Sequence, residues 1–104
     1  MEEQSWFEVT TPLGFTVRTS EDYWKKLVEK HPDLEESLSV VQQALRTPSE
    51  VRRSIRDSGI LIFYHLIREK RWMVTVVRRL NGVGFLVTAY QTDAIKKGEQ
   101  VWTS

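Results

Sequence analysis

The chain contains no cysteine, so disulfide frameworks, thiolate metal sites and cysteine nucleophiles are excluded. It has no apolar run of membrane-spanning length, and residues 1–9 lack the basic and apolar regions of a secretory signal. There is also no internal repeat and no low-complexity tract. These absences predict a cytoplasmic protein that is not stabilised by disulfides and makes no membrane contact.

What is present is the composition of an ordinary globular domain. Apolar residues make up 40% of the chain and charged residues 28%, far from the composition of disordered proteins. A length of 104 residues suffices for one hydrophobic core and is short for two. We therefore expect residues 1–104 to form a single domain.

The charges nearly cancel, at +1 overall, but they are unevenly distributed. Up to Glu50 acidic residues outnumber basic ones, whereas the rest of the chain is rich in basic residues: Arg52, Arg53, Arg56, Arg68, Lys70, Arg71, Arg78, Arg79, Lys96 and Lys97. A local excess of positive charge indicates an anionic partner, with phosphate favoured. The alternative is that these are solvated residues at strand ends and turns, which we prefer for Arg68, Lys70 and Arg71.

The first third of the chain predicts a β-hairpin followed by a helix. Residues Trp6 to Arg18 place β-favouring side chains around turn formers at 12–14. Ser20, followed by two acidic residues, is typical of a helix N-cap. This helix should end before Pro32, because the residue preceding a proline disfavours helical geometry.

A second helix and four strands are predicted next. The helix would begin at an Asp33 N-cap, with Glu36 at the capping-box position, and end before Pro48. Alternating patterns then predict strands at Glu50 to Arg56, Ile60 to Ile67, Trp72 to Leu80 and Val83 to Tyr90. Residues 92–104 read as a terminal extension laid against the domain. The expected fold is α+β, with the N-terminal hairpin and two helices packed on a four-stranded antiparallel sheet.

The Asn-Gly pair at 81–82 predicts a two-residue hairpin turn, because both positions require positive φ. Counting outward from this turn places Val77 opposite Leu86 and Thr75 opposite Thr88. The two threonines should therefore be neighbours on one face of the sheet.

A row of polar side chains follows from the same counting. If Ile67 faces Trp72, Tyr64 lies opposite Thr75 and joins the threonines, while His65 points toward the helices. Either Arg52 or Arg53 would border the row, depending on the length of the preceding loop. The helices should then cover the other face, which carries Trp72, Val74, Val76, Phe85, Val87 and Ala89.

Metal-free phosphodiester chemistry fits the remaining polar residues best. Glycine-rich nucleotide motifs are missing, and two histidines without acidic neighbours at ligand spacing do not predict a metal site, so no cofactor is expected. RNA cleavage requires a base for the 2′-hydroxyl, an acid for the leaving oxygen, and groups that stabilise the phosphorane. The candidates for these roles are His31, Arg52, Arg53, Arg56, Tyr64, Thr88 and Tyr90.

Each candidate also has a purely structural explanation. His31 before Pro32 could simply end the first helix. The sequence favours this structural role and a catalytic role equally. Thr88 would be an ordinary β-branched strand residue, and Tyr64 and Tyr90 would lie at the edge of a core. Only the convergence of several polar groups on one face favours a functional role.

The order of motifs resembles a known group of nucleases. The segments are "EKHPDL", "ALRTPSEVRRS", "ILIFYHL", "RWMVTVVRRLNG" and "GFLVTAYQTDAIKKGEQVW". From Phe15 to Trp102 the chain resembles the phage-associated branch of the superfamily that includes barnase, EndoU, colicin RNases and RelE-like toxins. The resemblance implies a metal-independent, toxin-type ribonuclease with His31 as acid or base, Arg53 or Arg56 as a phosphate clamp, sheet-face contacts from Tyr64, Thr88 and Tyr90, and a further cation from Lys97.

The expected activity is RNA binding on the exposed sheet face with cleavage to a 2′,3′-cyclic phosphate. Expected partners are RNA and, for a toxin, an antitoxin or immunity protein. The alternative is a non-catalytic RNA- or protein-binding module of the same fold. An apolar patch of Met73, Val77 and Leu86 on the face of the polar row would suit a partner surface or a homodimer.

Overall fold

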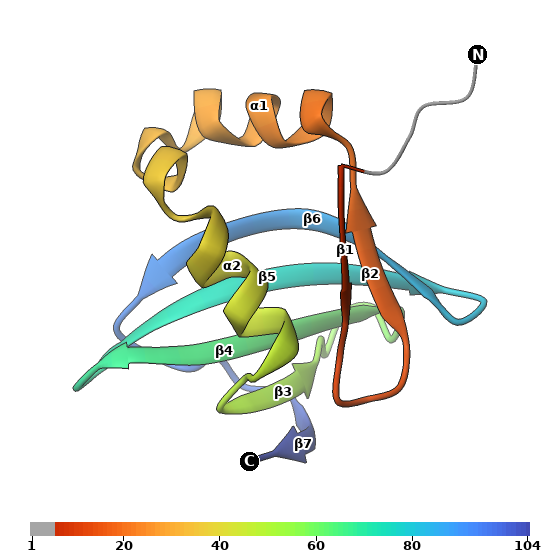
Figure 1. Ribbon diagram of the computed structural model, residues 1–104. Helices are drawn as coiled ribbons and strands as arrows, with labels where there is room; N and C mark the ends of the chain where they lie inside the picture. The colour runs from red at the N-terminus through yellow and green to blue at the C-terminus, as the bar shows by residue number, and fades with distance from the viewer. Residues whose placement is uncertain (1–5) are drawn as a thin grey trace.

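The computed structural model describes residues 6–104, which form an α+β structure with two α-helices and a seven-stranded mixed open sheet (Figure 1). The elements are β1 (Phe7–Thr10), β2 (Thr16–Thr19), α1 (Glu21–Lys30), the 3₁₀ helix η1 (Pro32–Glu36), α2 (Leu38–Arg46), β3 (Glu50–Arg53), β4 (Ile60–Arg68), β5 (Arg71–Leu80), β6 (Val83–Thr92) and β7 (Glu99–Thr103). None of the helices in this described part is long and apolar enough to cross a membrane.

The sheet is larger than expected, with the strand order β1-β2-β6-β5-β4-β3-β7. The four predicted strands form its centre. The N-terminal hairpin packs its buried side chains into the core as expected, and it also extends the sheet, because β2 pairs in parallel with β6. Gly84 permits this close approach, since a Cβ there would lie 2.7 Å from the Phe15 ring. At the other edge the predicted extension forms β7, which satisfies the backbone groups of β3.

The first helix agrees with its prediction, and the start of the second does not. The Ser20 hydroxyl caps α1 by accepting a hydrogen bond from the Tyr23 amide at 3.1 Å. Asp33 does not start an α-helix, because Pro32–Glu36 forms a separate 3₁₀ turn and α2 begins only at Leu38. Leu34 in the 3₁₀ turn is fully buried in the core, as are Val41, Ala44 and Leu45 of α2.

The β5–β6 register holds only near the turn. Val77 lies opposite Leu86 as predicted, but a register shift follows, and Val76 pairs with Thr88. Val87 is thus the extra residue of a β-bulge. Beyond it Thr75 lies opposite Ala89 rather than Thr88, so the predicted pair of threonines is not formed.

The β4–β5 hairpin is also one residue away from its predicted register. Leu66, not Ile67, lies opposite Trp72, because the chain turns tightly at Lys70 with a φ of 57° and the register shifts beyond Leu66. Tyr64 therefore faces Val74 instead of Thr75.

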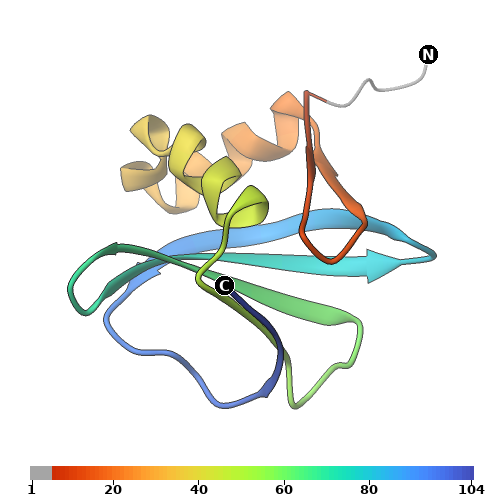
Figure 2. The ribbon, with the colours of Figure 1, turned by 60° about the horizontal axis from the view of Figure 1, so that its bottom comes forward.

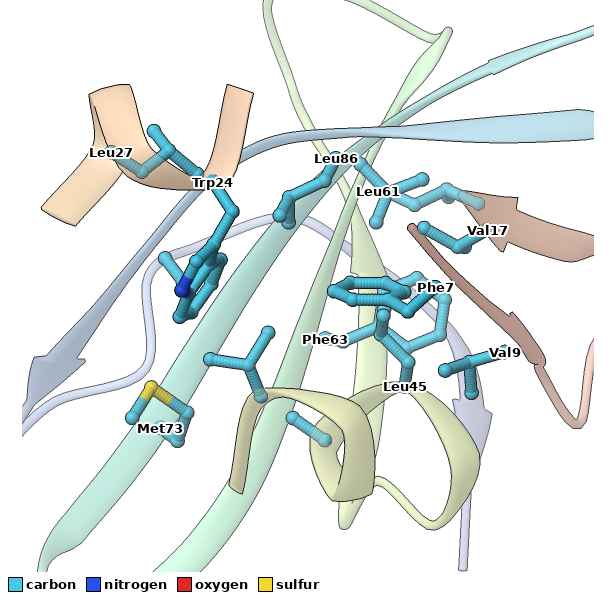
Figure 3. Packing of buried hydrophobic residues seen from close by; sticks show 14 of the residues in the cluster. Phe7, Val9, Val17, Trp24, Leu27, Leu45, Leu61, Phe63, Met73 and Leu86 are labelled. Atoms are coloured by element: carbon cyan, nitrogen blue, oxygen red, sulfur yellow. The ribbon is translucent and has the colours of Figure 1, made fainter. Parts of the chain in front are cut away.

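These two shifts decide which face the helices cover. Their side of the sheet carries Phe63, Met73, Thr75, Val77, Leu86 and Ala89, all buried, and Figure 3 shows Phe63, Leu86 and Met73 among side chains of the helices and the hairpin. The prediction that helices cover Trp72, Val74 and Val76 is wrong, because a slip of one residue moves every side chain of a strand to the other face. The other side, which we call the open face, is covered by neither α1 nor α2 (Figure 2).

Thr75, predicted to face away from the helices, is fully buried beneath them. Its Oγ1 has no hydrogen-bond partner among the residues that the structure describes. Because an unsatisfied buried hydroxyl is costly and valine has nearly the same shape, Thr75→Val is expected to raise the free energy of unfolding by about 1 kcal/mol. Urea denaturation measures this, with Thr103→Val at an exposed site as the control. A loss of stability on Thr75→Val would mean that the hydroxyl is satisfied.

Candidate functional site

Two rows of side chains cross the open face from β3 to β6. By the strand pairings, one row is Glu50, Tyr64, Val74 and Tyr90, and the next is Arg52, Ile62, Val76 and Thr88. Neighbouring members of a row lie about 5 Å apart on adjacent strands. Glu50 and Arg52 on β3 and Thr88 and Tyr90 on β6 thus frame both rows, and Tyr64 and three aliphatic side chains lie between them.

Residues 93–98, which we call the strap, join β6 to β7 and run along the open face (Figure 2). The Lys96 amide donates a hydrogen bond to the Tyr64 hydroxyl at 3.1 Å. The Arg52 guanidinium donates one to the Gly98 carbonyl at 3.2 Å. Tyr64 is only 1% exposed although neither α1 nor α2 lies on its face, and the strap contacts it there.

The side chains of Glu50, Arg52 and Tyr90 and the backbone of Lys96 surround the Tyr64 hydroxyl. We call these five residues the Tyr64 cluster: Glu50, Arg52, Tyr64, Tyr90 and Lys96. The Glu50 carboxylate accepts a charge-assisted hydrogen bond from Arg52 Nε at 2.6 Å. The Lys96 ammonium lies 5.8 Å from the centre of the Tyr90 ring, within range of a cation–π interaction.

The Tyr64 hydroxyl stays protonated, and it accepts the hydrogen bond from the Lys96 amide. Burial raises the pKa of Tyr64, and the hydrogen bond from the Lys96 backbone opposes this only in part. The neutral phenol is therefore the stable form at and above neutral pH.

Four of the predicted site residues do share the open face: Arg52, Tyr64, Thr88 and Tyr90. Lys97 lies exposed in the strap. The residue opposite Tyr64 is Glu50 rather than an arginine, because residues 54–59 make a longer loop than predicted. Arg52 lies two residues beyond Glu50 on β3, in the adjacent row, opposite Ile62.

The other three predicted site residues lie elsewhere. Arg53 pairs with Leu61 on the helix side of the sheet and forms an ion pair with Glu99 at 3.3 Å. Arg56 is exposed in the loop after β3. His31 closes α1 and so belongs to the helix layer, where its amide donates to the Leu27 carbonyl (Figure 1). The structure does not bring these three into the Tyr64 cluster.

His65, predicted to point toward the helices, does so. Its Nδ1 lies 3.1 Å from the Thr47 carbonyl at the end of α2, and its neighbour on β5 is Met73 rather than Val74. It is therefore outside the candidate site.

Sequence reasoning missed Glu50 and Lys96. Glu50 could have been found, because a residue two positions before Arg52 on a strand shares its face. Nothing local marked Lys96, since the strap has no periodicity and its position depends on contacts with distant strands.

Charge on the open face is partly neutralised. Besides the Glu50–Arg52 pair, Arg78 binds Asp57 at 2.8 Å, and this hydrogen bond lowers the pKa of Asp57. Among residues 6–104, neither Lys96 nor Lys97 forms an ion pair, so the strap lysines are the cations best placed to receive an anion. Within the same range, no three acidic or histidine side chains are grouped as metal ligands.

No protein-family model, no curated protein and no solved structure matches this chain.

Proposed function

We propose that this chain is a metal-independent, toxin-type ribonuclease domain that binds single-stranded RNA across its open face and cleaves it to a 2′,3′-cyclic phosphate. The observation that carries the proposal is the Tyr64 cluster. It joins a carboxylate, a guanidinium, an ammonium group and phenol hydroxyls on the one sheet face that the helices leave uncovered.

These groups match the requirements of RNA transesterification. Glu50 would accept the proton of the 2′-hydroxyl, whose oxygen then attacks phosphorus. The bond from phosphorus to the 5′-oxygen breaks, and that oxygen takes a proton from Tyr90 or Lys96. Arg52 would stabilise the added negative charge on the phosphorane. Glu50 thus takes the role that the sequence suggested for His31.

Binding would combine charge with stacking. Lys96 and Lys97 offer unpaired ammonium groups to the phosphates, and an exposed phenylalanine, Phe85, shares the face with Tyr90. Aromatic faces stack on unpaired bases, which favours single-stranded RNA over a duplex.

The resemblance found in the sequence supports the same function. In it, α1 and α2 correspond to the N-terminal helical region of the barnase, EndoU, colicin and RelE-like superfamily, and β3 to β6 correspond to its sheet. A toxin of this type would have an antitoxin or immunity protein as its partner.

The second candidate function is a non-catalytic RNA- or protein-binding module. Two observations favour it. Glu50 and Arg52 bind each other at 2.6 Å, which occupies both groups, and apolar Ile62, Val76 and Phe85 make up much of the remaining face. Apolar surface of this kind suits a partner as well as it suits bases.

The test uses purified protein, a fluorescent single-stranded RNA and EDTA, with binding followed by anisotropy and products by gel. We expect salt-sensitive binding and products ending in a cyclic phosphate. DNA of the same sequence should bind but stay intact, because it lacks the 2′-hydroxyl. Binding of RNA without cleavage would favour the non-catalytic module, and the absence of both would refute the proposal.

The position of binding is tested with matched variants. Replacing Lys96 and Lys97 by glutamine should reduce the slope of log affinity against log salt by about 1.4, as expected for two lost contacts to single-stranded phosphate. Replacing Lys25 and Lys26 on exposed positions of α1 removes the same charge from the helix layer and should leave the slope unchanged. Equal effects of the two changes would place the RNA elsewhere.

A further inference from the structure

The strap is fixed at both ends by strand pairing. Thr92 is the last residue of β6 and pairs with Trp72, while Glu99 begins β7 and pairs with Arg53. Between these points the backbone could take many paths across the open face. Its observed path is defined by the Lys96 and Gly98 hydrogen bonds to sheet residues.

Tyr64 provides the more central of these two anchors. It is 1% exposed, so its ring cannot contact a substrate while the strap is in place. Its hydroxyl receives the Lys96 amide at 3.1 Å, and the Lys96 side chain then extends over the Tyr90 ring. A lysine ammonium can reach only as far as its four-carbon stem allows, so the region that it can occupy depends on where its backbone is held.

We infer that Tyr64 is a positioning residue whose hydroxyl holds the strap at Lys96 and so keeps the Lys96 ammonium beside Tyr90 at the RNA-binding surface. The anchoring of the strap by Tyr64 is independent of the proposed function, and only the role in RNA binding rests on it. It removes Tyr64 from direct catalysis and assigns phosphate recognition to the strap.

The persistence of the neutral phenol agrees with this role. A deprotonated Tyr64 would be a buried anion, which is why burial raises the pKa of this residue. The anchor therefore keeps one protonation state over the range in which the protein would bind RNA.

The decisive variant is Tyr64→Phe, which keeps the buried ring and removes only the hydroxyl. Amide hydrogen exchange at Lys96 should become about fivefold faster, as expected for the loss of one hydrogen bond. The matched control is Tyr23→Phe, which also deletes a tyrosine hydroxyl bonded to backbone, here the Val87 carbonyl at 2.7 Å on the other side of the sheet. Exchange at Lys96 should be unchanged in the control.

Affinity for RNA gives the second readout. Tyr64→Phe should weaken binding about threefold, and adding Lys96→Gln should cost less in this background than in the wild type, because both changes remove one coupled contact. Unchanged exchange at Lys96, or fully additive losses of affinity, would overturn the inference. If the wild type binds no RNA, the proposed function fails, while the exchange result still decides whether Tyr64 holds the strap.

Discussion

Phe63→Ala is expected to lower the free energy of unfolding by about 3–5 kcal/mol, the largest stability effect that we predict. Phe63 is fully buried at the centre of the sheet, and its ring packs edge-on against Phe15 at 6.3 Å between centroids. Truncation would remove this contact and leave a cavity between the sheet, the hairpin and α2 (Figure 3). Urea denaturation followed by tryptophan fluorescence measures the change.

The control for this prediction is the adjacent residue on the same strand. Ile62 points to the open face and is only half-buried, so Ile62→Ala should cost about 1 kcal/mol. Similar losses for the two variants would contradict the assignment of faces. A smaller loss for Phe63→Ala than for Ile62→Ala would mean that the helices pack on the opposite side.

Glu50→Gln is expected to slow RNA cleavage by at least about 100-fold, because an amide cannot accept the proton of the 2′-hydroxyl. The change keeps the size of the side chain, and Arg52 can still donate to the amide oxygen. Binding should be equal or slightly tighter, since one negative charge leaves the proposed RNA-binding surface. Single-turnover cleavage in EDTA, measured alongside anisotropy, separates these two effects.

A second carboxylate provides the matched control. Glu99 also pairs with an arginine, Arg53, but that pair forms between β3 and the edge strand β7, outside the Tyr64 cluster. Glu99→Gln should therefore leave cleavage within about twofold of the wild type. His31→Ala should do the same, because His31 lies in the helix layer. Loss of cleavage in His31→Ala but not in Glu50→Gln would reverse the assignment and restore the role suggested by the sequence.

The candidate site was partly predictable, despite two errors in register. The β4–β5 hairpin and the β5–β6 bulge each shift the pairing by one residue. Between β4 and β6 the two shifts add up to two residues, so Tyr64 lies in line with Tyr90 instead of Thr88. A shift by an even number of residues keeps every side chain on its predicted face. Tyr64, Thr88 and Tyr90 therefore share the open face as predicted, whereas Thr75 lies on the opposite face.

Other parts of the site could not be predicted, because they depend on contacts between distant segments. The loop at 54–59 places Glu50 opposite Tyr64 and sends Arg53 to the helix side. The strap reaches the open face only because β7 pairs with β3, almost fifty residues earlier in the chain. No local pattern in residues 93–98 encodes this position.

By itself the sequence determined the features that depend on neighbouring residues. These are the Ser20 cap, the end of α1 before Pro32, the turn at 81–82 and the α+β class. Capping, proline geometry and positive φ act within a few residues, so they can be inferred locally. Tertiary structure alone decided the bulge at Val87, the face that the helices cover and the path of the strap. Those features follow from the burial of one continuous core and the pairing of edge strands, to which residues far apart in the chain contribute together.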